Sequence, residues 1–166
     1  MLARLVFDSI KYLDERAKES NDLNQRNKQC LVILHREIAL NTELLFECAR
    51  FGIQAGLKKQ LLMSTQDAAI EAISHIGITV SSLFDKDNLS WSPQQSRVKR
   101  LERGQYKKRL DRIHNKQVLI ERSYHRLKIA RIYAQCDCPK PPDSMLYVAN
   151  LFLASKFATS SADTAY

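Results

Sequence analysis

Glycine and proline are scarce in this chain, with four of each among 166 residues. Three of the prolines stand close together, at Pro139, Pro141 and Pro142. An all-β domain of this size needs more turn residues than that, so the composition argues against sandwiches and barrels. Hydrophobic residues make up 45% of the chain and charged residues 27%, which argues against disordered and fibrous classes.

Long apolar runs are also missing. No stretch approaches the roughly 20 consecutive apolar residues that a membrane helix requires. The first fourteen residues include Arg4, Asp8 and Lys11, where a signal peptide keeps an unbroken apolar segment. We therefore expect a cytoplasmic protein without a transmembrane segment.

The patterns that carry catalysis or bind metals are largely absent. The four glycines are isolated, and no Gly-x-Ser-x-Gly elbow or His-Glu-x-x-His motif occurs. Cys136 and Cys138 form a close pair, but a structural zinc site needs a second pair, and Cys30 and Cys48 fall on predicted helices. We expect no metal and no cofactor, and we expect a binding protein rather than an enzyme.

Apolar residues recur every three or four positions along most of the chain, which is typical of amphipathic helices. Asp22 and Gln25 form a capping pair, and Ser92, Pro93 and Gln95 supply a cap, a first-turn proline and a capping partner. The predicted helices span approximately residues 2–19, 22–50, 67–83, 92–135 and 143–158, and Ser64 or Thr65 is expected to cap the third. We therefore predict an all-α, single-domain helical bundle over residues 1–158, with about five helices and one long basic helix. A flexible C-terminal tail follows at 159–166.

The last predicted helix, residues 144–158, is apolar nearly all round. Such a helix is either inserted into the core or covered by another subunit. We expect it to contact a protein partner or a second copy of the chain.

The net charge of +8 is distributed unevenly. Residues 97–131 contain thirteen Lys or Arg against three acids, so this segment alone carries +10. From Tyr106 to Arg131 the apolar positions alternate by four and three, which predicts a heptad-like seam. The basic residues fall off the seam and are expected to form an outward stripe of about 30 Å. The stripe consists of Lys107, Lys108, Arg109, Arg112, Lys116, Arg122, Arg126 and Lys128.

A cationic stripe of this length suits a polyanion, because neutralising several phosphates releases condensed counterions. We expect the protein to act as a non-enzymatic subunit of a larger complex that binds nucleic-acid backbone without reading sequence. Tyr106 and Tyr124 lie on the seam, so base stacking is not expected. The alternative is an assembly or adaptor subunit whose basic helix pairs with an acidic protein partner.

Arg109 and His114 are separated by four residues. This spacing resembles that of HEPN-type helical ribonucleases, which are also compact helical bundles. The resemblance implies an Arg and a His that act together on RNA, commonly across a dimer. It covers two residues, and Leu110 stands where the family favours a polar residue. A helical-bundle ribonuclease that uses Arg109 and His114 is therefore the enzymatic alternative.

Overall fold

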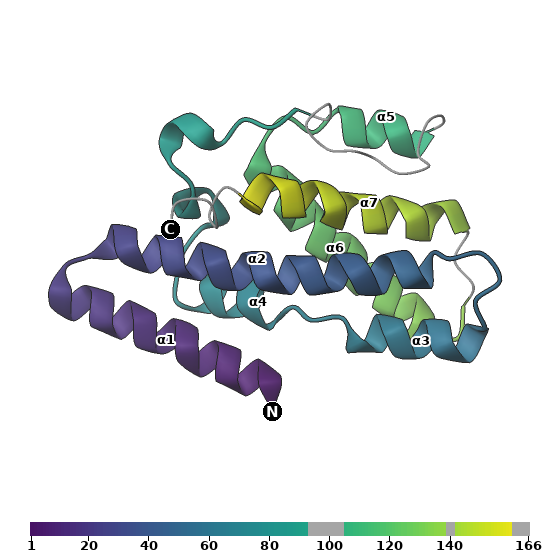
Figure 1. Cartoon of the computed structure of the whole chain (residues 1–166), viewed down its shortest axis with the longest axis horizontal. Helices are drawn as coiled ribbons and strands as arrows, with labels where there is room; N and C mark the ends of the chain where they lie inside the picture. The colour runs from purple at the N-terminus through teal and green to yellow at the C-terminus, as the bar shows by residue number, and fades with distance from the viewer. Residues whose placement is uncertain (93–104, 139–141, 161–166) are drawn as a thin grey trace.

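The computed structural model describes residues 1–92, 105–138 and 142–160, with the side chains of these ranges except at positions 105, 142 and 143. The α-helices are α1 (Leu2–Ser20), α2 (Leu23–Cys48), α3 (Ala55–Ser64), α4 (Ala68–His75), α5 (Gln105–Asp111), α6 (Lys116–Gln135) and α7 (Pro142–Thr159). Two short 3-10 helices, η1 (Val80–Leu83) and η2 (Lys86–Asn88), follow α4. The prediction of an all-α helical bundle is confirmed (Figure 1). Most of the predicted tail, residues 161–166, lies outside the described residues.

The first two helices begin and end close to their predicted positions. The Asp22 carboxylate accepts a hydrogen bond from the backbone N–H of Gln25 at 3.1 Å and caps α2. Asp14 of α1 is buried and pairs with Arg26 of α2 at 2.7 Å. This pair ties the two helices together near the turn between them.

The predicted third helix begins close to its observed position but extends too far at its C-terminal end. Its predicted start at Asp67 is the N-cap residue of α4, which begins at Ala68. An unpredicted helix, α3, already occupies Ala55–Ser64, and Thr65 has an extended backbone that separates it from α4. At the other end α4 stops at His75, because Gly77 adopts a φ of +80° that glycine tolerates and other residues rarely do. The predicted helix is thus reduced to α4 and the short η1.

The predicted long basic helix is also interrupted. α5 ends at Asp111 and α6 begins at Lys116. The Asn115 side chain accepts backbone hydrogen bonds from Gln117 at 2.8 Å and Val118 at 3.3 Å, so it caps a new helix. Of the predicted start of this helix, Ser92 is described, whereas Pro93 and Gln95 lie outside the described residues.

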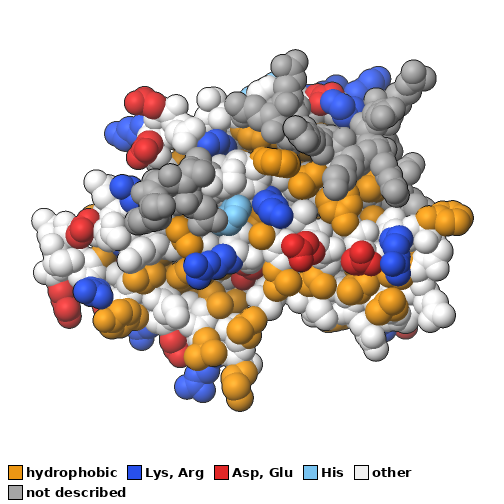
Figure 2. Space-filling model, viewed as in Figure 1, with side chains coloured by type: hydrophobic (Ala, Val, Ile, Leu, Met, Phe, Trp, Pro, Cys, Tyr) orange, Lys and Arg blue, Asp and Glu red, His pale blue; other side chains and the backbone are white. Residues whose placement is uncertain are grey.

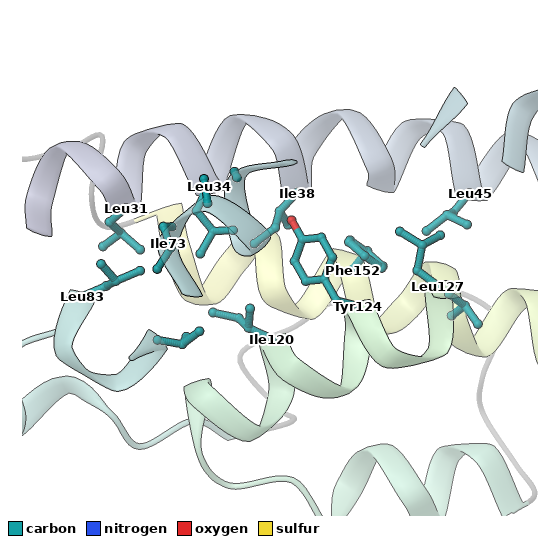
Figure 3. Packing of buried hydrophobic residues seen from close by; sticks show 14 of the residues in the cluster. Leu31, Leu34, Ile38, Leu45, Ile73, Leu83, Ile120, Tyr124, Leu127 and Phe152 are labelled. Atoms are coloured by element: carbon teal, nitrogen blue, oxygen red, sulfur yellow. The ribbon is translucent and has the colours of Figure 1, made fainter. Parts of the chain in front are cut away.

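The apolar helix α7 lies inside the molecule rather than on its surface. It packs against α2 and α6 on one side and α5 on the other. Phe152 of α7 meets Tyr124 of α6 edge to face, with 5.2 Å between the ring centroids, and Ile38 of α2 lies nearby (Figure 3). Of the two predicted settings for this helix, the structure shows insertion into the core, because the helices of its own chain bury it. A protein partner or a second copy stays a prediction. Among the described residues no helix, α7 included, is long and apolar enough to cross a membrane.

Buried side chains form two hydrophobic clusters, and α7 contributes to both. The larger cluster joins α7 to α1, α2, α4 and α6, and includes Ile38, Ile120 and Phe152. The smaller cluster packs Trp91, Leu110 and Ile113 against the opposite face of α7. α7 therefore holds α5 and the segment before it onto the bundle.

Replacing Ile120 tests this packing. Ile120 is fully buried in the larger cluster, so Ile120→Ala should lower the free energy of unfolding by about 2–5 kcal/mol. The matched control is Val118→Ala on the same helix, where the side chain is 42% exposed and the change should be within about 0.5 kcal/mol. Chemical denaturation measures both. Equal effects at the two positions would contradict the described orientation of α6.

Candidate nucleic-acid interface

The break between α5 and α6 is held by the chain that precedes α5. Backbone hydrogen bonds run from Trp91 N–H to the His114 carbonyl at 2.9 Å and from Lys116 N–H to the Leu89 carbonyl at 2.8 Å. They form an isolated antiparallel bridge between Ser90 and Asn115. These bonds satisfy backbone groups that an uninterrupted helix would have used. The break between α5 and α6 is therefore a turn that backbone hydrogen bonds hold in place.

The turn lets α5 fold back against α7. Leu110 and Ile113 are buried in the smaller cluster, and the Tyr106 ring stacks on the Tyr147 ring of α7 with 5.1 Å between centroids. The tyrosine pair therefore fixes the outer edge of α5. The sequence prediction that Tyr106 serves packing is in keeping with this contact.

Three of the eight predicted binding residues are already engaged within the chain. Lys107 forms an ion pair with Asp111, and Lys128 pairs with Glu71 of α4 at 2.7 Å. Lys116 is only 6% exposed, and its ammonium donates to the Asn88 Oδ1 at 3.0 Å. Burial lowers the pKa of Lys116. Its position corrects the prediction that this side chain lies on the outward stripe.

The other five predicted residues form no ion pair with an acid among the described residues. Lys108 and Arg112 are exposed, and Arg122 is half-buried one turn before Arg126 on α6. We call this set the basic surface: Lys108, Arg109, Arg112, Arg122 and Arg126. Figure 2 shows Lys and Arg side chains, in blue, at the upper right of the molecule, where Figure 1 places α5.

Contacts with the two tyrosines join the α5 and α6 halves of the basic surface. The Arg109 guanidinium lies 5.4 Å from the Tyr106 ring centroid, and that of Arg126 lies 5.9 Å from the Tyr147 ring centroid. Because the two rings stack on each other, cations seventeen positions apart in the sequence meet the same tyrosine pair. An unbroken helix would separate them by about 25 Å along its axis. The predicted straight stripe is therefore broken, and Arg109 and Arg126 meet at one tyrosine pair.

The two residues of the ribonuclease-like spacing belong to different structural segments. Arg109 lies in α5 and is directed to the Tyr106 ring. His114 is exposed in the turn after α5, and its carbonyl is held by Trp91. No hydrogen bond joins the two side chains among the described contacts.

The cysteines divide into a buried pair on α2 and an exposed pair at the end of α6. Cys30 and Cys48 are buried in the larger cluster, whereas Cys136 and Cys138 are exposed at the end of α6. Burial raises the pKa of each buried thiol to about 11, so both are protonated at neutral pH. Within the described part of the chain, no group of three His, Cys, Asp or Glu side chains is placed to hold a metal ion.

A buried acid that the sequence analysis did not single out lies between α2, α4 and α6. Glu37 of α2 accepts hydrogen bonds from Tyr124 Oη at 2.7 Å and from the backbone N–H of Ala69 at 2.8 Å. Burial raises the pKa of Glu37, and burial together with the Glu37 carboxylate raises the pKa of Tyr124. Its position beside Ile38 on the inward face of α2 was the available sequence signal. The acid joins α2, α4 and α6, which is a structural role.

An open cleft of about 470 Å³ lies between α4 and α6, and Tyr124 forms part of its wall. The Glu71–Lys128 ion pair crosses it, and His75 and His125 line it. The cleft is therefore lined by both acidic and basic side chains, whereas the basic surface consists of cations. This mixture of charges gives the cleft no preference for a polyanion.

In comparisons with protein-family models, with curated proteins and with solved structures, no match to this chain was found.

The Asn115 cap provides a test of the junction. Asn115→Ala removes the acceptor for two backbone N–H groups and should lower the free energy of unfolding by about 1 kcal/mol. Hydrogen exchange should quicken most at the backbone N–H groups of Gln117 and Val118. The exposed Asn24→Ala in α2, which caps nothing described, serves as the control. Unchanged exchange at the start of α6 would show that the side chain does not hold the turn.

Glu37 provides a test based on pH. Since the folded chain binds the Glu37 proton more tightly than the unfolded chain does, this residue makes stability fall as pH rises above about 4.3, the ordinary Glu pKa. Glu37→Gln should therefore become more stable relative to wild type as pH rises through that window. The exposed Glu43→Gln on the same helix should show no such trend. Parallel curves for the two variants would contradict the burial of an ionisable Glu37.

Proposed function

We propose that this protein is a non-enzymatic helical binding subunit whose basic surface contacts the phosphate backbone of nucleic acid. The observation that carries the proposal is the set of five cations on α5 and α6 that have no acidic partner among the described residues. Elsewhere the helices pair many of their charges, as Lys128 does with Glu71 and Arg131 with Asp67. Cations on α5 and α6 that pair with no acid in the described part of the chain are suited to bind phosphates and release counterions.

The residue types favour backbone contact over base recognition. The basic surface is rich in arginine, whose planar guanidinium donates two parallel hydrogen bonds to a phosphate. Tyr147 is buried and Tyr106 is stacked on it, so these rings are occupied by each other rather than offered to bases. We therefore expect binding that depends on salt and varies little with sequence.

The arginines at the tyrosine pair have a further consequence for the site. Arg109 and Arg126 approach the ring faces, which limits the positions that their guanidinium groups adopt. A cation that is already positioned loses less side-chain entropy when it binds. Lys108, Arg112 and Arg122 provide the more mobile contacts around this centre.

The proposal is tested by the double variant Lys108→Glu/Arg122→Glu, which changes one residue of each helix and leaves the tyrosine contacts intact. Its affinity for mixed-sequence DNA and RNA oligonucleotides, measured by fluorescence anisotropy at low salt, should fall by at least about tenfold. The slope of log affinity against log salt should flatten by about two. The effect should be similar for unrelated sequences.

The matched control is Lys28→Glu/Arg36→Glu, which makes the same charge change at exposed positions of α2. It should bind as wild type does apart from a small effect of net charge. Lys116→Met should also bind as wild type, since this side chain is buried. Equal loss in the control and in the Lys108→Glu/Arg122→Glu variant would contradict a local binding surface.

The alternatives are separate outcomes of the same experiment. A wild-type protein that binds neither DNA nor RNA at low salt would overturn the proposal and favour an acidic protein partner. RNA cleavage that is lost in both Arg109→Ala and His114→Ala would instead favour the ribonuclease interpretation.

A further inference from the structure

A cavity of about 340 Å³ lies between α3 and α6 and reaches Met145 of α7. Figure 1 shows α3 beside the end of α6, and the two helices are in contact. The base of the cavity consists of Leu62, Ala130 and Met145, which are buried members of the larger hydrophobic cluster. The cavity therefore opens part of the core to the surface. We call it the α3–α6 cavity.

The lining of the α3–α6 cavity is mainly apolar. Besides the three residues of the base, Ala55 and Gly56 of α3 and the half-buried Ala134 of α6 line it. The cleft between α4 and α6 differs, because acids, a lysine and two histidines line it. Mainly apolar walls with a few polar groups are typical of sites that bind small molecules.

The charged side chains of the lining favour an anion. They are Lys58, Lys59 and Asp137. Lys59 Nζ donates to Asp137 Oδ1 at 2.9 Å, so these two charges offset each other. Lys58 is half-buried and pairs with no acid in the described part of the chain. The lining thus combines one uncompensated cation with an apolar base.

The volume of the α3–α6 cavity limits the size of its occupant. Sites for small molecules measure about 300–1,000 Å³, and this cavity is near the lower limit. A helix of a partner protein is about 10–12 Å across, so even one of its turns would exceed this volume. The space is therefore suited to a short chain rather than to a folded segment.

We propose that the α3–α6 cavity binds a small molecule that has an apolar chain and one carboxylate. The chain packs against Leu62, Ala130 and Met145, and the carboxylate accepts a charge-assisted hydrogen bond from Lys58. No residue of the lining belongs to the basic surface, so this inference does not depend on the proposed function.

The test compares two probes that have the same chain and opposite charges, octanoate and octylammonium, by isothermal titration calorimetry. Octanoate should bind wild type saturably with a Kd of about 1 mM or tighter. Octylammonium should bind at least about tenfold more weakly, because its ammonium meets the like charge of Lys58. The variant Lys108→Glu/Arg122→Glu should bind octanoate as wild type does, even where it has lost nucleic acid.

Replacing Lys58 tests the position of the carboxylate. Lys58→Gln should weaken octanoate by about tenfold and should not weaken octylammonium. The matched control is Lys28→Gln at an exposed position of α2, which should bind both probes as wild type does. Equal affinity of Lys58→Gln and Lys28→Gln for octanoate would contradict the role of Lys58.

Filling the cavity tests the position of the chain. Ala134→Leu adds a side chain from α6, and Ala55→Leu adds one from an exposed position of α3, where folding is least at risk. Each variant that folds as wild type does by circular dichroism should bind octanoate at least about tenfold more weakly. Ala3→Leu, at an exposed position of α1, is the matched control and should bind normally.

Two exposed thiols report the same site without any change to its walls or its charge. Cys138 lines the cavity, whereas Cys136, two residues away, does not. Saturating octanoate should slow the reaction of N-ethylmaleimide with Cys138, measured in the Cys136→Ser variant, by at least about threefold. The reaction of Cys136, measured in Cys138→Ser, should keep its rate.

Four results would overturn the proposal. Wild type that shows no saturable octanoate binding up to about 10 mM would have no site of useful affinity. Octylammonium that binds as tightly as octanoate would exclude recognition of an anion. Unchanged octanoate affinity in Ala55→Leu would place the chain elsewhere. Equal protection of Cys136 and Cys138 would show an effect that is not local to the cavity.

Discussion

The burial of α7 is the constraint on which the rest of the structure depends. One face of this helix, with Met145, Val148 and Phe152, packs into the larger hydrophobic cluster. Tyr147, Leu151 and Ala154 pack into the smaller one. A helix with only one apolar face could not bind α5 and the α2–α6 pair at once, so its nearly uniform apolarity is what joins both parts of the fold.

The position of the basic surface follows from this burial. Tyr147 is only 1% exposed, yet its ring stacks on Tyr106 and contacts Arg126. The Tyr147 hydroxyl has no hydrogen-bond partner among the described residues, so the ring rather than the hydroxyl explains why tyrosine or another aromatic residue suits this position. The Tyr147 ring therefore packs the core, contacts Arg126 of α6 and stacks on the Tyr106 ring, which contacts Arg109 of α5.

The sequence predicted the elements whose signals are local. The Asp22 cap defined the start of α2, and the apolar positions of α7 indicated burial or a covering subunit. The core provided that covering. Leu110 of α5 packs in the smaller cluster and Ile120 of α6 in the larger one, and the sequence alone could not place these helices against α7. The same limit applies to the stacking of Tyr106 on Tyr147, which joins residues forty-one positions apart.

The errors in the sequence prediction have physical causes. Heptad spacing continues through residues 112–115, so the pattern indicated one helix, but the cap by Asn115 and the backbone bonds to Leu89 and Trp91 favoured a turn. Lys116 was assigned to the surface because it falls off the heptad seam, whereas here its Nζ donates to Asn88 and lies 5.1 Å from the Phe84 ring centroid. These contacts depend on segments distant in the sequence, and no helical periodicity reports them.

The proposed phosphate binding depends on five cations of α5 and α6 that pair with no acid in the described part of the chain. The most direct measurement is the affinity of wild-type protein for a mixed-sequence duplex over a range of salt concentrations. The account predicts a linear fall of log affinity with log salt, with a slope between about −2 and −5, since each neutralised phosphate contributes about −0.9. A slope near zero, or no binding at the lowest salt, would contradict it.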